Sequence, residues 1–258
     1  MFDFRKSSAT ESRPWACVVA TALCAHACVA AQACTIEVSA VLIVPTNCRH
    51  SIGSSQFYTD VIVQDKGQLD LLAGAVLSIR DTLIIDSGGT FRFNDQTDSA
   101  INQPRLRATL FLLVIGNITT VSGADQGGII DASASGNHVH LVRGSISSQF
   151  GPVLIACPFE NDGIVTANGI ADGFDIIFTG QIRNGSTGTF EVTHANSEMI
   201  FNHDVSSGSP SLSGDADFNV EAGLMHFQKS LATAGGFRQT GGRVRVSAGR
   251  FFSATGQY

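Results

Sequence analysis

Two histidines in one short segment are the residues whose types and spacing first suggest chemistry. His138 and His140 are separated by one residue, so in an extended strand both imidazoles point to the same face. Two such imidazoles can bind Zn²⁺, but a zinc site needs a further protein ligand of defined geometry. Spacing alone identifies no third ligand, and His194 and His203 lie further along the chain. The pattern therefore favours a solvated outer strand face beside Asn137 over a metal site.

A pair of carboxylates suggests hydrolysis instead. Asp172 and Asp175 lie in the segment ADGFDI, which resembles the N-T-D-G-(I/F)-D-I segment of polygalacturonase-like glycoside hydrolases, themselves parallel β-helices. The resemblance implies that the two carboxyl groups act as acid and as base or nucleophile on a glycosidic bond. Ala171 stands where that family has Thr, and the family's Asp-Asp, Gly-His-Gly and Arg-Ile-Lys segments are absent. Because Asp-Gly is also common turn chemistry, a corner is the favoured interpretation, and catalysis by Asp172 and Asp175 is the alternative.

Other polar patterns are weaker. Asp215 and Asp217 suggest calcium, but the Gly-Gly-x-Gly-x-Asp repeats of calcium-binding β-rolls are missing, which favours a turn. Asn117 and Asn184 each begin an N-x-(S/T) glycosylation pattern. Four arginines make the end of the sequence locally basic: Arg238, Arg243, Arg245 and Arg250. Arg243 and Arg245 alternate with valines, which predicts a solvated outer strand face, with contact to anionic glycans as the alternative.

The elements that position these residues are predicted to be short stacked strands. Residues 60–95 contain four alternating triplets, centred on Asp70, Ser78, Ile84 and Arg92. Glycine or aspartate recurs at seven-residue intervals between them, at Gly67, Gly74, Asp81 and Gly88, and the interval returns at Gly235, Gly242, Gly249 and Gly256. Period-two alternation marks strands with one buried face, and the regular corners mark a repeat. The pattern predicts an all-β, right-handed, single-stranded parallel β-helix (a β-solenoid) of roughly 20–23 residues per coil.

Composition agrees with strands and turns. The 258 residues include 27 Gly and 17 Phe, and only 15% are charged. The net charge of −6 gives no electrostatic reason to expect nucleic acid as a partner. The chain is long enough to bury one sizeable core.

The segment 1–33 is typical of a secretory signal peptide. A basic start precedes an apolar run of small residues at 16–31, and Ala31-Gln32-Ala33 supplies a cleavage pattern before Cys34. The run is short for a membrane anchor, and a lipoprotein would usually have a Leu that is missing here. We therefore predict a signal peptide over 1–33, an N-terminal cap over 34–59 and a β-helix over 60–258, with truncation at the C-terminus left open, and no membrane span in the mature chain.

Three cysteines remain after such a cleavage. In an oxidising compartment Cys34 and Cys48 are the plausible disulfide pair, closing a short loop. Cys157 is left over and is predicted to be a buried small apolar residue. The spacing of the three suits neither a zinc site nor a redox motif.

The repeat style carries a second resemblance. The segments GGTFRF, GQLDLLAGAVLSI and GGFRQTGGRVRVSAGRFFSATG are similar to the repeats of secreted β-helical proteins, particularly adhesin-like and autotransporter-passenger-like surface proteins. The resemblance implies a secreted or cell-surface, extracytoplasmic structural or adhesive module without catalytic activity, cofactor or metal. Its implied partners are surface glycans or other repeat chains.

Overall fold

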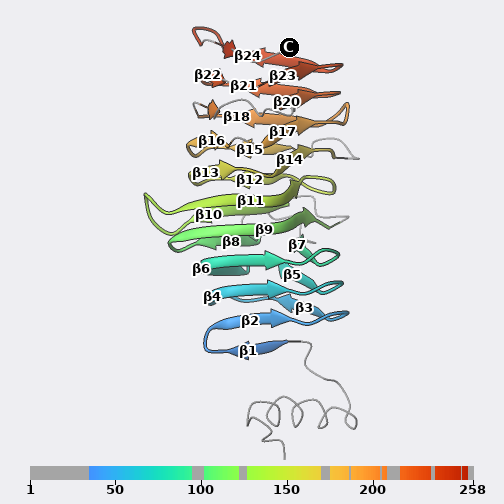
Figure 1. The fold of residues 1–258 in the computed structure, drawn as a ribbon, viewed down its shortest axis with the longest axis vertical. Coiled ribbons are helices and arrows are strands. Elements are labelled where there is room, and N and C mark those ends of the chain that lie inside the picture. Colours follow the sequence, from blue (N-terminus) through green and yellow to red (C-terminus); the bar gives the residue numbers. More distant parts are fainter. Residues whose placement is uncertain are drawn as a thin grey trace, which may run out of the picture. The chain divides into compact units, whose positions relative to one another are not determined.

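The computed structural model of the chain describes residues 35–94, 102–121, 127–169, 175–185, 187–203, 205–207, 216–233, 236–250 and 252–254. The chain divides into two compact units, 1–33 and 34–258, and the described residues all belong to the second. The predicted signal peptide and Cys34 lie outside the described residues. Nearly every described element is a β strand, and the strands stack one above another along a single axis (Figure 1).

Parallel pairing sorts the strands into three rows, which the chain visits in the order A, B, C. Row A consists of residues 56–58 of β4 (Gln56–Val63), 76–79 of β6 (Val76–Ile85), β8 (Arg105–Ala108), β10 (Gly128–Ala132), β12 (Val153–Ile155), β15 (Ile176–Phe178), β18 (Glu198–Phe201), β21 (Leu224–Phe227) and β24 (Arg243–Val246).

Row B consists of β2 (Val41–Val44), residues 60–63 of β4, 82–85 of β6, 111–115 of β9 (Phe111–Thr120), 138–141 of β11 (His138–Ser147), β13 (Phe159–Asn161), β16 (Ile182–Asn184), β19 (Val205–Ser207), β22 (Leu231–Thr233) and β25 (Phe252–Ala254). Row C consists of β3 (Arg49–Ile52), β5 (Gln68–Leu72), β7 (Thr90–Asn94), residues 118–120 of β9, 145–147 of β11, β14 (Ile164–Ala167), β17 (Thr189–Val192), β20 (Ala216–Val220) and β23 (Gly236–Gln239).

This arrangement confirms the predicted parallel β-helix. Phe159 pairs with Ile182, a separation within the predicted coil length, whereas Thr82 pairs with Leu113 across a longer coil. The longer coil contains residues 95–101, which lie outside the described residues. Among the described strands one pair is antiparallel: β1 (Ile36–Val38) folds back on β2, while β2 itself pairs in parallel with β4.

Two of the four predicted triplets, those centred on Ser78 and Ile84, belong to one continuous strand, β6. The predicted corner at Asp81 is present as the change of direction from row A to row B, but it is a bend within one strand and not a turn between two strands. Aspartate is common at bends and turns alike, so residue type alone does not separate the two.

The corner between rows B and C in β9 and β11 depends on stacked glycines. Gly116 and Gly144 are register partners with φ of 120° and 106°, a backbone region that residues with a Cβ rarely adopt. A Cβ on Gly144 would also overlap the carbonyl oxygen of Gly116. The corner thus needs glycine for both its conformation and its close coil-to-coil contact.

The core runs inside the three rows, filled by alternate side chains of the strands. In its C-terminal half, phenylalanines form two ladders among the other apolar side chains. In row A Phe201 stacks between Phe178 and Phe227, with ring centroids 5.1 and 4.8 Å away. In row C Phe190 stacks on Phe218 at 5.5 Å, and the two ladders meet edge to face, as between Phe190 and Phe201 at 5.2 Å. Identical residues one coil apart therefore help to specify the register of the stack.

Candidate functional site

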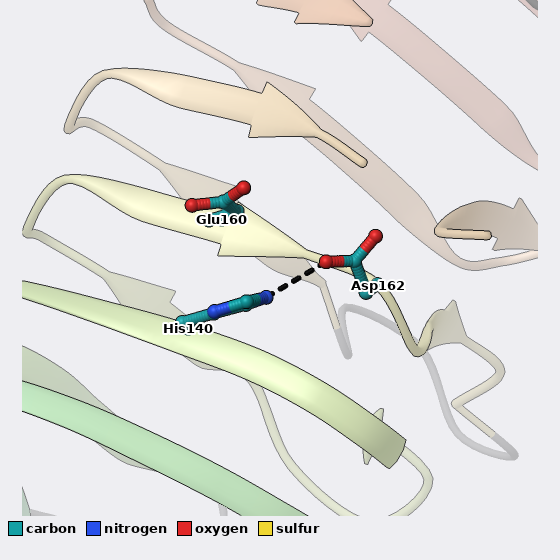
Figure 2. A group of neighbouring side chains, drawn as sticks. All are labelled: His140, Glu160 and Asp162. Carbon is teal, nitrogen blue, oxygen red and sulfur yellow. Dashed lines mark hydrogen bonds and ion pairs between the residues drawn. The ribbon is translucent and has the colours of Figure 1, made fainter. Parts of the chain in front are cut away.

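Three potential metal ligands meet on the outer side of row B. His140 on β11 and Glu160 on β13 are register partners, so their side chains leave adjacent coils in the same direction (Figure 2). Asp162 follows β13 and reaches back: its Oδ2 lies 2.8 Å from Nε2 of His140. The nearest ligand atoms of His140, Glu160 and Asp162 all lie within 4.8 Å of one another. The side chains are 17%, 24% and 26% exposed, so the group is partly desolvated.

Neighbouring residues hold this group in place. The backbone N–H of Asp162 donates to the carbonyl of Leu141 at 2.8 Å, and the Thr187 hydroxyl donates to the Asp162 carbonyl at 2.9 Å. On the next coil Nη1 of Arg183 lies 3.4 Å from Oε1 of Glu160, and the Arg183 side chain is 65% exposed. An exposed cation therefore lies beside the partly buried Glu160 carboxylate of the group.

His138 lies on the outer face of β11, as predicted, although it is only partly exposed. Its ring packs against Phe111 on the preceding coil, with centroids 4.1 Å apart, and His138 is not part of the three-ligand group. Sequence reasoning missed Glu160 and Asp162 as partners of His140. Glu160 is the register partner of His140 on the next coil, and Asp162 lies two positions beyond Glu160. Both separations match the predicted coil length, and this match is the signal that could have found them.

A second polar group lies on the outer side of row A. Oδ1 of Asp175 accepts the backbone N–H of Glu198 at 2.9 Å. Burial raises the pKa of Asp175; the hydrogen bond from the Glu198 backbone opposes the rise, and the Glu198 charge adds to it. Asp172, its predicted partner, lies outside the described residues. The structure instead brings Glu198, a carboxylate of the next coil that sequence reasoning missed, next to Asp175.

Glu198 continues into a chain of hydrogen-bonding groups across two further coils. Nδ1 of His226 lies 3.2 Å from Oε1 of Glu198, and Nε2 of His226 lies 3.4 Å from Oγ of Ser247. Carboxylate, imidazole and hydroxyl in this order can move a proton from the hydroxyl. A pocket of about 340 Å³ lies nearby, but its lining does not include Ser247: it is formed by Leu224, Gln239, Gly242, Arg243, Val244 and Arg245.

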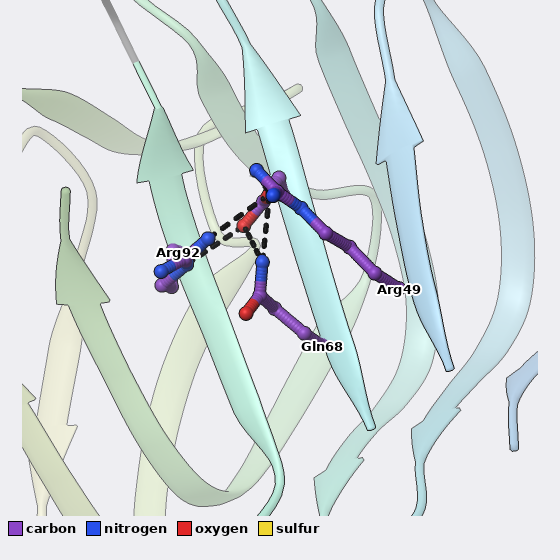
Figure 3. Close-up of polar contacts among 4 residues, drawn as sticks. Arg49, Gln68 and Arg92 are labelled. Atoms are coloured by element: carbon purple, nitrogen blue, oxygen red, sulfur yellow. Dashed lines mark hydrogen bonds and ion pairs between the residues drawn. The ribbon is translucent and has the colours of Figure 1, made fainter. Parts of the chain in front are cut away.

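Paired arginines neutralise two outward-facing aspartates. The Asp70 side chain on β5 is fully buried beneath Arg49 and Arg92 of the flanking coils, with Gln68 beside it, and Figure 3 shows Arg49, Gln68 and Arg92 converging. Burial opposes ionisation of Asp70, but hydrogen bonds from Arg92 and then Arg49, with the Arg92 charge, outweigh it and lower its pKa.

Asp131 in row A has a similar arrangement. Both of its oxygens accept hydrogen bonds from Arg107 at 2.9 Å, and Arg105 lies 3.2 Å away. These pairs tie adjacent coils together through outward-facing side chains.

The remaining predicted positions have varied surroundings. Asn184 is fully buried and its Nδ2 donates to the carbonyl of Gly188 at 2.8 Å, so a glycan there is incompatible with the fold. Asn117 is exposed and accepts a hydrogen bond from Ser145. Asp215 lies outside the described residues, as does the side chain of Asp217. His203 is exposed, and Nδ1 of His194 accepts the Asn196 backbone N–H at 3.4 Å.

The arginine and cysteine predictions have mixed outcomes. Arg243 and Arg245 are exposed on β24, while Val244 and Val246 pack against the core, which confirms the predicted alternation. Arg238 and Arg250 are exposed as well. Cys157 is a buried free thiol, 2% exposed, as predicted. The Cys34–Cys48 disulfide stays a prediction because Cys34 lies outside the described residues.

Comparisons with known proteins do not assign a function. No family model matches the chain, and neither the curated proteins nor the solved structures contain a match to it. Within the described ranges, no helix has the length and apolar character needed to cross a bilayer. The function must therefore be inferred from the side chains themselves.

Proposed function

We propose that the chain is an extracytoplasmic structural or adhesive β-solenoid without catalytic activity, exported by its segment 1–33. The observation that supports this most directly is the use of charge on the outer faces. Two arginines neutralise each of Asp70 and Asp131, from the two flanking strands for Asp70 and from the one strand β8 for Asp131. These groups therefore stabilise the stack instead of converging on a substrate. A rigid stack with long side surfaces suits surface glycans or other repeat chains as partners.

Export is tested by following the N-terminus. The full chain, carrying a C-terminal tag, is produced in a host with a general secretion pathway, and the exported form is sequenced from its N-terminus. We expect the exported form to begin at Cys34, because Ala31-Gln32-Ala33 is the cleavage pattern. Retention inside the cell with the segment 1–33 intact would contradict the extracytoplasmic proposal.

Adhesion is tested with the exported protein coupled to beads. We expect the beads to bind immobilised surface polysaccharides or to aggregate with one another, because the available surface is broad and repetitive. Beads that neither bind any surface polysaccharide nor aggregate would contradict the adhesive part. The structural part would then rest on the protein being found in an ordered surface layer by electron microscopy.

Polysaccharide hydrolysis is the second candidate, and one observation favours it. Asp175 has a raised pKa, which suits a general acid, and Glu198 of the next coil supplies a second carboxylate beside it. The assay is release of reducing ends from pectin-type polymers. Activity that Asp175→Asn abolishes, but that Asp86→Asn at an exposed corner preserves, would establish the enzyme and overturn the non-catalytic proposal.

A further inference from the structure

We propose that His140, Glu160 and Asp162 bind a divalent first-row transition-metal ion, with Zn²⁺ as the probe. The site is independent of whether the solenoid is adhesive or enzymatic, because it lies on row B, away from Asp175 and its neighbours on row A. Its function would be to bridge two coils, since His140 belongs to β11 whereas Glu160 and Asp162 belong to the next coil.

The donor set matches the ion. Imidazole nitrogen and carboxylate oxygen are the usual zinc donors besides thiolate, and three protein ligands leave a position for water. Ligand atoms on one tetrahedral zinc are roughly 3.4 Å apart, given bonds of about 2.1 Å. The His140–Asp162 contact is 2.8 Å and no pair exceeds 4.8 Å, so side-chain rotations alone bring the three to coordination distance.

The hydrogen bond between His140 and Asp162 shows how the ion would enter. Nε2 and Oδ2 lie 2.8 Å apart, and the ion would replace the proton that such a hydrogen bond shares, with the imidazole then carrying its proton on Nδ1. Both atoms are already aimed at the shared point. The carbonyl of Leu141 and the hydroxyl of Thr187 restrain the backbone of Asp162, so little ordering is required on binding.

Arg183 gives the proposal a distinctive signature. Its guanidinium forms an ion pair with Glu160 at 3.4 Å, and it would compete with the metal ion for the same carboxylate. The side chain is 65% exposed and can swing into solvent. Removing its charge should therefore tighten metal binding, an effect that a purely structural ion pair would not produce.

The chain also contains a matched control. His226 and Glu198 form a comparable imidazole–carboxylate pair between adjacent coils, with their atoms 3.2 Å apart. That pair is not part of any group of three donors among the described residues. If simple pairing of imidazole and carboxylate were enough for metal binding, both places would bind the ion equally.

The test compares zinc binding by the metal-free full chain and its variants, using isothermal titration calorimetry and the thermal unfolding midpoint. We expect Glu160→Gln to abolish the binding of one zinc equivalent, or to lower the affinity for it at least tenfold. We expect Glu198→Gln to leave this affinity unchanged. Arg183→Gln should strengthen it several-fold. Circular dichroism confirms that each variant is folded, and Glu160→Gln is chosen because it keeps the His140–Asp162 hydrogen bond.

Cysteine ligation is the competing source of zinc binding. The Co²⁺-loaded protein separates the two, because thiolate ligands produce an intense charge-transfer band that nitrogen and oxygen ligands lack. The proposal would be overturned if Glu160→Gln left zinc binding unchanged, or if Glu198→Gln lost the same equivalent of zinc. It would also be overturned if the Co²⁺ ion bound in place of this zinc equivalent showed only the thiolate band.

Discussion

Nε of Arg92 donates a hydrogen bond to Oδ1 of Asp70 at 2.8 Å, from one coil to the coil before it. The two residues are register partners in row C, and Asp70 is completely buried although it lies on the outward side of its strand. Arginine stems, and not the core, bury this carboxylate. Ion pairs on the outer faces thus stabilise the solenoid in addition to its apolar interior, and their contribution can be tested.

Replacing Asp70 with Asn should destabilise the stack, because the guanidinium groups of Arg49 and Arg92 lose the negative charge between them and one of its two acceptor oxygens. We expect a loss of about 1–3 kcal/mol, the range for leaving a hydrogen-bonded charge without its buried partner. The measurement is urea unfolding followed by circular dichroism. The matched control is Asp81→Asn, whose pair with Arg80 is exposed on both sides and should change stability by less than ~0.5 kcal/mol. Equal effects of the two substitutions would show that burial beneath arginine adds nothing.

The Asp70 cluster also predicts a pH dependence. The folded protein lowers the pKa of Asp70 from its ordinary 3.8. A depressed carboxylate pKa stabilises the folded state above the ordinary value, and this contribution is lost as the pH falls through the folded-state pKa. The stability advantage of wild type over Asp70→Asn should therefore be complete at pH 6 and shrink below about pH 4. An advantage that stays constant down to pH 2.5 would exclude ionisation of Asp70 as its cause.

Asp175 should behave in the opposite sense. Burial raises its pKa, so the folded state binds this proton more tightly than the unfolded chain does. The contribution of this bound proton to folded-state stability is present below the ordinary pKa of 3.8 and is lost as the pH rises through the raised pKa. Asp175→Asn should therefore leave the urea midpoint at pH 7 unchanged or higher, because Asn keeps an acceptor for the Glu198 N–H and removes repulsion. A lower midpoint at pH 7 would contradict this account.

The phenylalanine ladder should be sensitive at its centre. Phe201→Ala removes a ring that stacks on both Phe178 and Phe227, and we expect a cost of about 3–5 kcal/mol from lost transfer and cavity formation. Phe57→Ala is the control, since Phe57 is 54% exposed and should cost far less. Thermal unfolding monitored by near-ultraviolet circular dichroism reports both stability and aromatic packing. Similar midpoints for the two variants would show that the ladder is not a source of stability.

The stacked glycine corner separates conformational strain from steric overlap. Gly144→Ala would introduce both backbone strain and a steric overlap with Gly116. Gly136 has a similar φ of 98° but nothing within 4 Å of the position that a Cβ would take, so Gly136→Ala would introduce strain alone. Gly136→Ala should cost about 1 kcal/mol, the usual cost of a positive φ, and Gly144→Ala clearly more. Urea midpoints of both variants give the comparison, and equal losses would show that the coils separate freely at this corner.

The repeat could be predicted from the sequence better than the site. Alternation and glycine spacing within residues 60–95 are local, and they are sufficient to place strands and corners. The change of direction at Asp81 was predicted, but the continuation of β6 through it as one strand was not, because a bend and a turn use the same residues. Their proximity in the sequence made Asp172 and Asp175 the predicted catalytic pair of the alternative hypothesis. The described partner of Asp175 is instead Glu198 on the next coil.

The amino-acid sequence alone is enough to specify the class of fold, because its short strands have one buried face and turn at regularly spaced glycines. It does not specify which outward side chains meet, because each meeting depends on the register between coils. Coil length varies along the stack: Val41 pairs with Asp60 across a short coil, whereas Thr82 pairs with Leu113 across a long one. A shift of one residue would turn His140 away from Glu160, because successive side chains point to opposite faces of a strand. The core ladders and the arginine pairs set that register in three dimensions, and through it they set which side chains form each surface site.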